Sequence, residues 1–253
     1  MWPVHLTLLC LGILHFLSVT NGSRIVGGQF AEKNQFPHQV ALLKDGRLYC
    51  GGSVLTETWV VTAAHCLKDG NNVYPPKRFE VLAGVLEHKD QSGGQLLKAK
   101  KLIPHEGYGN FFNDIGLVQT DRKFVFGENV QPIPLRKSPL PGGTEMVISG
   151  WGRTGFNDEL SDRLQYTKMR SIPLKQCTEE IGITYPGIIC VVATEEGSHG
   201  PCSGDSGGPA VVNNELVGVA NFARIGCGVN PDGYANVPNF VDWIENHLDK
   251  NDY

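Results

Sequence analysis

Residues 204–209 read Gly-Asp-Ser-Gly-Gly-Pro, and no other stretch of the chain says more about its fold. Ser206 offers a hydroxyl group between glycines, which allow the backbone to approach a ligand closely. Asp205 places a carboxylate beside that hydroxyl, and a buried carboxylate requires a cationic partner. A glycine-flanked serine is also common in ordinary turns, so the meaning of this stretch depends on what accompanies it.

Three further segments supply the groups that a reactive serine needs. A serine hydroxyl is a poor nucleophile at neutral pH unless a base removes its proton, and histidine titrates near neutrality. His65 lies in Thr-Ala-Ala-His-Cys at 62–66, and Asp114 lies in Asn-Asp-Ile-Gly-Leu at 113–117, where a carboxylate can hold the imidazole in one tautomer. The third segment is Arg-Ile-Val-Gly-Gly at 24–28. Taken singly, these residues also fit a structural histidine and a turn aspartate.

With these segments and Ser-Gly-Trp-Gly at 149–152, the chain resembles the chymotrypsin/trypsin family of serine endopeptidases from Ile25 to its C-terminus. The resemblance implies an all-β fold of two six-stranded antiparallel Greek-key barrels with a C-terminal helix. The active site would lie in the cleft between the barrels. Ser206 would attack the scissile carbonyl, His65 would transfer the proton, and Asp114 would orient His65.

The resemblance also assigns an oxyanion hole and an activation step. The backbone N–H groups of Gly204 and Ser206 would stabilise the negative oxygen of the reaction intermediate. Cleavage after Arg24 would leave an ammonium group on Ile25, which in this family inserts beside Asp205 and forms the oxyanion hole. Because an α-amino group has a pKa of about 8, it is mostly charged at pH 7. The chain is therefore predicted to be a zymogen that an Arg-specific protease activates.

The N-terminal segment is predicted to lie outside the folded enzyme. An apolar run extends over 6–19, and small or polar residues follow it from Thr20, which is typical of a secretory signal peptide. The run is short for a transmembrane helix, which needs about 20 apolar residues. We expect a signal peptide at 1–22, an activation peptide at 23–24 and a protease domain at 25–253. The lack of a basic n-region leaves an uncleaved signal anchor as the alternative.

Short apolar runs recur along the mature chain with Gly and Pro between them, as in all-β sandwiches and barrels. They lie at 39–43, 53–55, 59–62, 79–83, 115–119, 145–149, 210–212 and 216–220. Helical periodicity is clear only near the C-terminus. A Pro-rich stretch at 131–143 divides the chain into two comparable halves. We expect barrel 1 at about 25–130, barrel 2 at about 144–237 and the helix at about 238–248.

The cysteines predict disulfide bonds. Of the seven, Cys10 lies in the predicted signal peptide, which leaves an even set of six for an oxidising compartment. Six cysteines allow 15 pairings, and sequence alone does not choose among them. The family resemblance implies the pairs Cys50–Cys66, Cys177–Cys190 and Cys202–Cys227. Metal binding is the weaker interpretation, because no Cys-x-x-Cys spacing occurs.

The residues predicted to line the substrate pocket depart from the family's common patterns. The base of the pocket is Gly200, where trypsin-like enzymes carry Asp, so simple Arg/Lys specificity is not expected. The wall, usually Ser-Trp-Gly, reads Asn221-Phe222-Ala223. Ala223 adds a methyl group near the pocket entrance, and Asn221 places an amide where a serine usually supports the catalytic Asp. Asp232 is either a carboxylate on the pocket wall or an ordinary turn residue. We expect a preference for large apolar residues before the scissile bond, with secondary tolerance for basic ones.

Composition and motifs also bound the partners. The net charge is −4 and no basic block occurs, so we expect no nucleic-acid partner. We expect a secreted, extracellular monomer with no cofactor, no metal and no stable membrane association. Its partners would be protein or peptide substrates, an activating protease and protein protease inhibitors. No calcium requirement is expected, because Val85 follows Gly84 where the family's calcium loop uses Glu.

The physiological role has several interpretations. The three-disulfide set and short activation peptide favour a digestive enzyme of invertebrate type. A regulatory protease of a defence or clotting cascade would share the same chemistry and differ in its substrate. A family member that binds without catalysis is the third possibility. Such proteins usually lose a member of the Ser-His-Asp triad, whereas this chain has all three residues.

Overall fold

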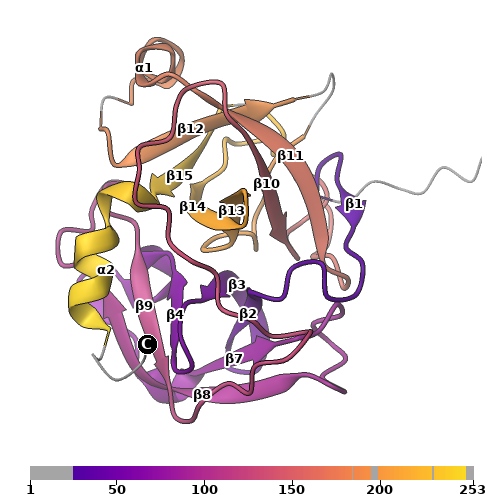
Figure 1. Ribbon diagram of the computed structural model, residues 1–253. Helices are drawn as coiled ribbons and strands as arrows, with labels where there is room; N and C mark the ends of the chain where they lie inside the picture. The colour runs from indigo at the N-terminus through magenta and orange to yellow at the C-terminus, as the bar shows by residue number, and fades with distance from the viewer. Residues whose placement is uncertain (1–24, 184, 195–198, 230, 249–253) are drawn as a thin grey trace, which may run out of the picture.

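A computed structural model describes residues 25–248 except 184, 195–198 and 230. Two closed antiparallel barrels of six strands each make up most of this part of the chain, one above the other in Figure 1. The predicted all-β architecture is therefore confirmed. The predicted signal peptide and Arg24 lie outside the described residues. Among the helices that are described, none has the length and apolar character needed to cross a membrane.

The first barrel closes in the order β2-β3-β4-β9-β8-β7. Its strands are β2 (Gln39–Lys44), β3 (Arg47–Val54), β4 (Trp59–Thr62), β7 (Phe79–Ala83), β8 (Gln95–Pro104) and β9 (Gly116–Thr120). Buried side chains such as Leu42, Val61, Phe79 and Leu117 fill its interior. The connections contain the 3-10 turns η1 (Ala64–Cys66) and η2 (Pro76–Arg78) and the short strands β5 (Lys68–Asp69) and β6 (Asn72–Val73).

The second barrel closes in the order β11-β10-β13-β14-β15-β12, because β12 also pairs with β11. Its strands are β10 (Glu145–Gly150), β11 (Gln165–Ile172), β12 (Ile188–Ala193), β13 (Pro209–Val212), β14 (Glu215–Phe222) and β15 (Asp232–Asn236). Its core includes Met146, Ile148, Met169, Val217 and Tyr234.

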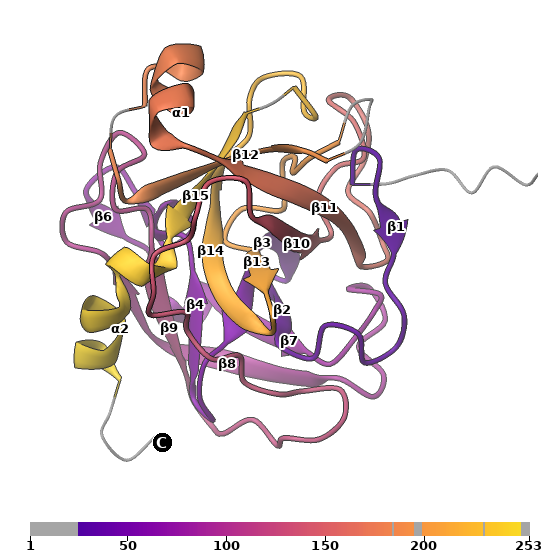
Figure 2. The same ribbon diagram turned by 45° about the horizontal axis from the view of Figure 1, so that its top comes forward.

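The two ends of the described chain fasten the barrels to each other. Strand β1 (Gln29–Phe30) pairs with β11 of the second barrel, although it precedes the first barrel in the sequence. Helix α2 (Val241–His247) packs on the first barrel, whose core includes Val241 and Ile244, and Figures 1 and 2 both place it beside β9. The predicted helix at about 238–248 begins later than expected, because Pro238 belongs to the separate 3-10 turn η3 (Val237–Asn239).

All eight predicted strands overlap observed ones, but several elements have no counterpart among the predictions. These are the two-residue strands β1, β5 and β6, the longer strands β8, β11, β12 and β15, and helix α1 (Leu174–Ile181). Helix α1 begins after Pro173 and ends at Gly182, which adopts a left-handed conformation with φ 73°. Leu174, Cys177 and Ile181 share one face, but the helix has only eight residues and only Cys177 is buried, so its periodicity is too short to stand out in the sequence.

Candidate active site

Strand pairing brings His65 and Asp114 to the same end of the first barrel. Thr62 at the end of β4 lies opposite Gly116 at the start of β9. His65 follows in the turn η1, and Asp114 comes two residues before β9. Asp114 is 1% exposed and accepts two hydrogen bonds from His65, one from its backbone N–H at 2.9 Å and one from Nδ1 at 2.7 Å. With its Nδ1 proton directed at the carboxylate, His65 keeps Nε2 as the basic nitrogen.

The loop that carries Ser206 is bonded to the strands just before His65. The Gly51 N–H in β3 donates to the Ser206 carbonyl at 2.8 Å, and the Thr62 hydroxyl donates to the Gly51 carbonyl at 2.8 Å. Gly207 has φ 77°, and a Cβ there would lie 2.1 Å from the Thr62 hydroxyl oxygen. Only glycine fits this contact, which explains the residue after Ser206. The second barrel thus presents Ser206 at the end of the first barrel where His65 lies.

Two backbone donors beside Ser206 are available to a ligand. Among the described residues, neither the Gly204 N–H nor the Ser206 N–H donates a hydrogen bond. Gly204 has φ 102°, and a Cβ there would meet the backbone of Gly152 at 3.1 Å. Both N–H groups belong to the loop predicted to hold an oxyanion.

Asp205 is buried beneath this loop, with 4% of its surface exposed. Its carboxylate accepts the Gly152 N–H at 2.8 Å and the Cys202 N–H at 3.0 Å. Burial raises the pKa of Asp205 to about 6, and the two hydrogen bonds oppose that rise. Ile25 is 1% exposed, but in the continuous chain its nitrogen belongs to a peptide bond and carries no charge. Asp205 is therefore held by neutral donors in this state.

Three of the five predicted pocket residues, Asn221, Phe222 and Ala223, line a cavity next to Ser206, whereas Gly200 and Asp232 do not line it. A small cavity of about 20 Å³, room for about one water molecule, is lined by Pro201, Cys202, Ser206, Ala220, Asn221, Phe222 and Ala223. Gly200 is buried and contacts the N-terminal segment, because its N–H donates to the Val26 carbonyl at 3.2 Å. The Cys202–Cys227 disulfide joins the serine loop to the segment after Ala223.

Asp232 is a buried strand residue, so its interpretation as an ordinary turn residue is wrong. It begins β15 and is 0% exposed. Its Oδ1 accepts the Arg224 N–H at 2.9 Å, whereas Oδ2 has no hydrogen-bond partner among the described residues. Burial raises the pKa of Asp232 to about 7. The carboxyl group is therefore partly protonated at neutral pH.

Asn221 does not bond to the catalytic carboxylate, unlike the serine it replaces. Its Nδ2 donates to the Phe111 carbonyl at 2.8 Å. Phe111 is 54% exposed, and its ring lies 5.4 Å from that of Phe222. The sequence analysis missed Phe111. The signal was present in the two adjacent aromatic residues, Phe111 and Phe112, which precede Asp114 in a polar loop.

The three disulfides pair as the family resemblance implied. Cys50, Cys66 and His65 bring three potential metal ligands within 4.8 Å of one another. The two sulfurs are joined in a disulfide, however, so neither is a thiolate that could bind a metal.

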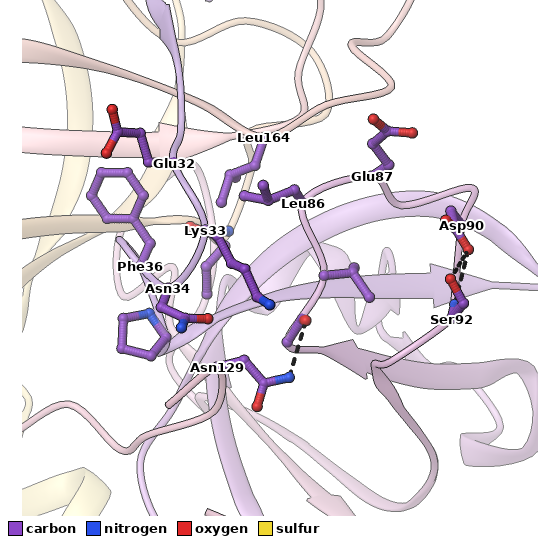
Figure 3. Close-up of a pocket in the computed structure, with 14 residues that line it drawn as sticks. Glu32, Lys33, Asn34, Phe36, Leu86, Glu87, Asp90, Ser92, Asn129 and Leu164 are labelled. Atoms are coloured by element: carbon purple, nitrogen blue, oxygen red, sulfur yellow. Dashed lines mark hydrogen bonds between the residues drawn. The ribbon is translucent and has the colours of Figure 1, made fainter. Parts of the chain in front are cut away.

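A second hollow of about 280 Å³ lies away from the pocket, between the segment after β1 and the loop after β7. Figure 3 shows Lys33, Asn34, Leu86 and Glu87 around it, and Asn129, whose Nδ2 donates to the Gly84 carbonyl at 3.3 Å. None of the residues predicted to act in catalysis lines it.

Comparison with known proteins agrees with this architecture. The family described as Trypsin matches residues 25–244. The chain is 46% identical to serine protease SP24D of Anopheles gambiae over 88% of this chain and 81% of that protein. It is 36% identical to trypsin-1 of Salmo salar over 89% of this chain and 91% of that protein.

Solved structures give the same result. Human heparin binding protein superposes with a TM-score of 0.79 at 29% identity, over 89% of this chain and 97% of that one. Neuropsin, a serine protease of the mouse brain, superposes with a TM-score of 0.79 at 27% identity, over 88% of this chain and 99% of that one.

Proposed function

Since this chain belongs to the trypsin family of serine proteases, we propose that it is a secreted endopeptidase that uses Ser206, His65 and Asp114. The hydrogen bond from His65 Nδ1 to the buried Asp114 carboxylate is the observation that carries the proposal. It leaves Nε2 free to accept the Ser206 proton. A non-catalytic homologue would have no need of this arrangement.

In the proposed mechanism, Ser206 Oγ attacks the scissile carbonyl while His65 Nε2 takes its proton. Asp114 stabilises the imidazolium that results. The N–H groups of Gly204 and Ser206 donate to the carbonyl oxygen as it becomes negative. His65 then protonates the leaving amine, and a water molecule hydrolyses the acyl-enzyme by the same steps in reverse order.

We propose that the chain is a zymogen cleaved after Arg24. The support is the buried Asp205, whose carboxylate has a raised pKa and, among the described residues, accepts hydrogen bonds from neutral donors only. A charged Ile25 amine would give it the cation that it lacks. The predicted signal peptide and the three disulfides support secretion, and a digestive role follows the sequence prediction.

For specificity, we propose a preference for large apolar residues before the scissile bond, with secondary acceptance of Arg and Lys. The lining residues Pro201, Ala220, Phe222 and Ala223 are apolar, which supports the first part. The buried Asp232 carboxyl supports the second. Strict Arg/Lys specificity is the competing proposal, because four of the relatives are named as trypsins or a putative trypsin.

A direct test is activation by an Arg-specific protease, followed by labelling with a phosphonate that reacts with nucleophilic serines. We expect labelling at Ser206 only after cleavage, and none in Arg24→Gln. Ser206→Ala should lower the rate by about a million-fold if the three residues act as a unit. An activated chain that never labels would make it a binding protein. Cleavage confined to Arg and Lys in a peptide series ending in Phe, Leu, Ala and Arg would overturn the proposed specificity.

A further inference from the structure

We propose that Asn221 is a positioning residue, which fixes the loop that carries Asp114 through the carbonyl of Phe111. This inference rests on the proposed function of Asp114. Asn221 belongs to β14 of the second barrel, whereas Phe111 and Asp114 belong to the first. The support that a serine usually gives to the carboxylate directly is here given three residues upstream.

The loop before Asp114 adopts a conformation that needs external support. Asn110, Phe111 and Asn113 have φ values of 48°, 68° and 53°. This left-handed region is unfavourable for residues with a Cβ atom, and asparagine tolerates it better than phenylalanine. Hydrogen bonds within the loop, from the Phe112 N–H to the Gly109 carbonyl at 2.9 Å and from Asn113 Nδ2 to the Gly107 carbonyl at 2.9 Å, hold part of this shape, and Phe111 is a partner in neither. The strain is therefore balanced by contacts with the rest of the protein.

The support for this loop comes from the second barrel. The Asn221 Nδ2 donates to the Phe111 carbonyl at 2.8 Å, and the hydroxyl of Tyr185 donates to the side-chain oxygen of Asn113. Two ring contacts accompany these bonds, one between Phe111 and Phe222 with centroids 5.4 Å apart and one between Phe112 and Tyr185 at 4.9 Å.

The Asn221 bond is well placed to be strong. Asn221 is 6% exposed, so water has little access to its amide, although Phe111 itself is 54% exposed. The amide orientation is also determined, because the opposite one would place two oxygens against each other. The Oδ1 atom has no hydrogen-bond partner among the described residues, which leaves the Phe111 bond as the contact that accounts for a buried amide at this position.

Backbone hydrogen bonds around Asp114 couple the position of its carboxylate to that of Phe111. The Ile115 N–H donates to the Asn113 carbonyl at 2.8 Å, which forms a tight turn around Asp114. The His105 N–H closes the loop by donating to the Ile115 carbonyl at 2.9 Å. The Asp114 carboxylate accepts two hydrogen bonds from His65, and its position depends on the backbone of this loop. Movement of the loop would therefore change the His65–Asp114 geometry.

The test compares Asn221→Ala and Asn221→Leu with Asn129→Ala in the activated protein. Asn129 is a matched control, since its Nδ2 also donates to backbone carbonyls, those of Gly84 and Gly93 at 3.3 and 3.2 Å, and it lines the second hollow (Figure 3) and not the cavity beside Ser206. We expect kcat and the rate of phosphonate labelling to fall about tenfold in both Asn221 variants, with KM within about twofold of the wild type. Asn129→Ala should leave kcat unchanged. Tyr185→Phe, which keeps the ring, should act in the same direction if an Asn221 variant fails to fold.

A second readout does not depend on catalysis. The proton on His65 Nδ1 can be followed by NMR in histidine labelled with ¹⁵N, and its signal should broaden in Asn221→Ala but not in Asn129→Ala. If the wild-type chain never labels at Ser206 but the proton signal still broadens in Asn221→Ala, the proposed function is overturned and this inference stands. An active wild type in which Asn221→Ala and Asn221→Leu change neither kcat nor the proton signal would overturn the inference. A rise in KM alone would assign Asn221 to substrate binding and overturn it too.

Discussion

The burial of the Asp232 carboxyl group predicts that the substrate preference of this protease changes with pH. The carboxyl group is 0% exposed, and burial raises its pKa to about 7. It is therefore mostly neutral below pH 7 and mostly negatively charged above it. A neutral carboxyl group does not discriminate against apolar side chains, whereas a charged one attracts Arg and Lys. Raising the pH should favour hydrolysis after basic residues.

The size of the effect follows from the fraction of Asp232 that is ionised. With a pKa of about 7, this fraction is about 10% at pH 6 and about 90% at pH 8. If only the ionised form accepts Arg, the ratio of kcat/KM for an Arg peptide to that for a Phe peptide should rise about ninefold across this range. The pH dependence of the catalytic residues cancels in the ratio, because both peptides use them.

The assay uses two chromogenic peptides that differ only in the residue before the scissile bond, measured from pH 5.5 to 8.5. Asp232→Asn is the control, since it keeps the size of the side chain and the Arg224 N–H contact but removes the titration. We expect a sigmoidal rise in the wild type and a flat ratio in the variant. A wild-type ratio that stays constant with pH would show that Asp232 does not contact the substrate, and the reasoning from its burial would fail.

Three more predictions concern stability. In an uncleavable Arg24→Gln chain, the raised pKa of Asp205, about 6 against an ordinary 3.8, means that the folded state binds more protons than the unfolded state. Its free energy of unfolding should therefore fall by about 2 kcal/mol between pH 4 and 6, and Asp205→Asn should reduce that slope in urea titrations. Replacing Cys177 and Cys190 by Ala, which opens a loop of 13 residues, should lower the free energy of unfolding by about 3 kcal/mol in the same assay. A decrease below about 1 kcal/mol would contradict the chain-entropy argument. EDTA should leave the Tm unchanged because Val85 offers no ligand, and a Tm that rises with added calcium would contradict this.

The architecture was predictable because short motifs in a fixed order identified the family. Strands with continuous apolar character, such as β4 and β7, were also visible in the sequence by themselves. Strand β8 was not, because a register shift between Ala99 and Lys101 interrupts its alternation between core and solvent and leaves Lys100 and Lys101 both exposed. Strand β15 begins with Asp232 and Gly233, residues that are typical of turns, and tertiary packing overrides that local preference.

The site was predictable to different degrees. Residues whose roles depend on backbone register, such as His65 and Asp114, lie where the motifs indicated. Residues whose roles depend on contacts between the barrels were not predictable. The partner of Asn221 is Phe111, 110 residues away in the sequence, and no local pattern connects the two. The burial of Asp232 likewise results from strands that meet only in the folded chain.

Polar contacts between the barrels explain why so much of the site depends on long-range structure. The Ser149 hydroxyl donates to the Gln39 side-chain oxygen at 2.7 Å, and both residues are buried between the barrels. The bonds of Gly51 to Ser206 and of Asn221 to Phe111 also cross this boundary. A purely apolar interface would hold the barrels together while allowing small shifts, because burial of apolar surface has no direction. Buried hydrogen bonds tolerate little displacement, since an unpaired group in this environment is costly. The interface therefore sets the position of the serine loop relative to His65, and substitutions there should affect catalysis more than their distance from Ser206 suggests.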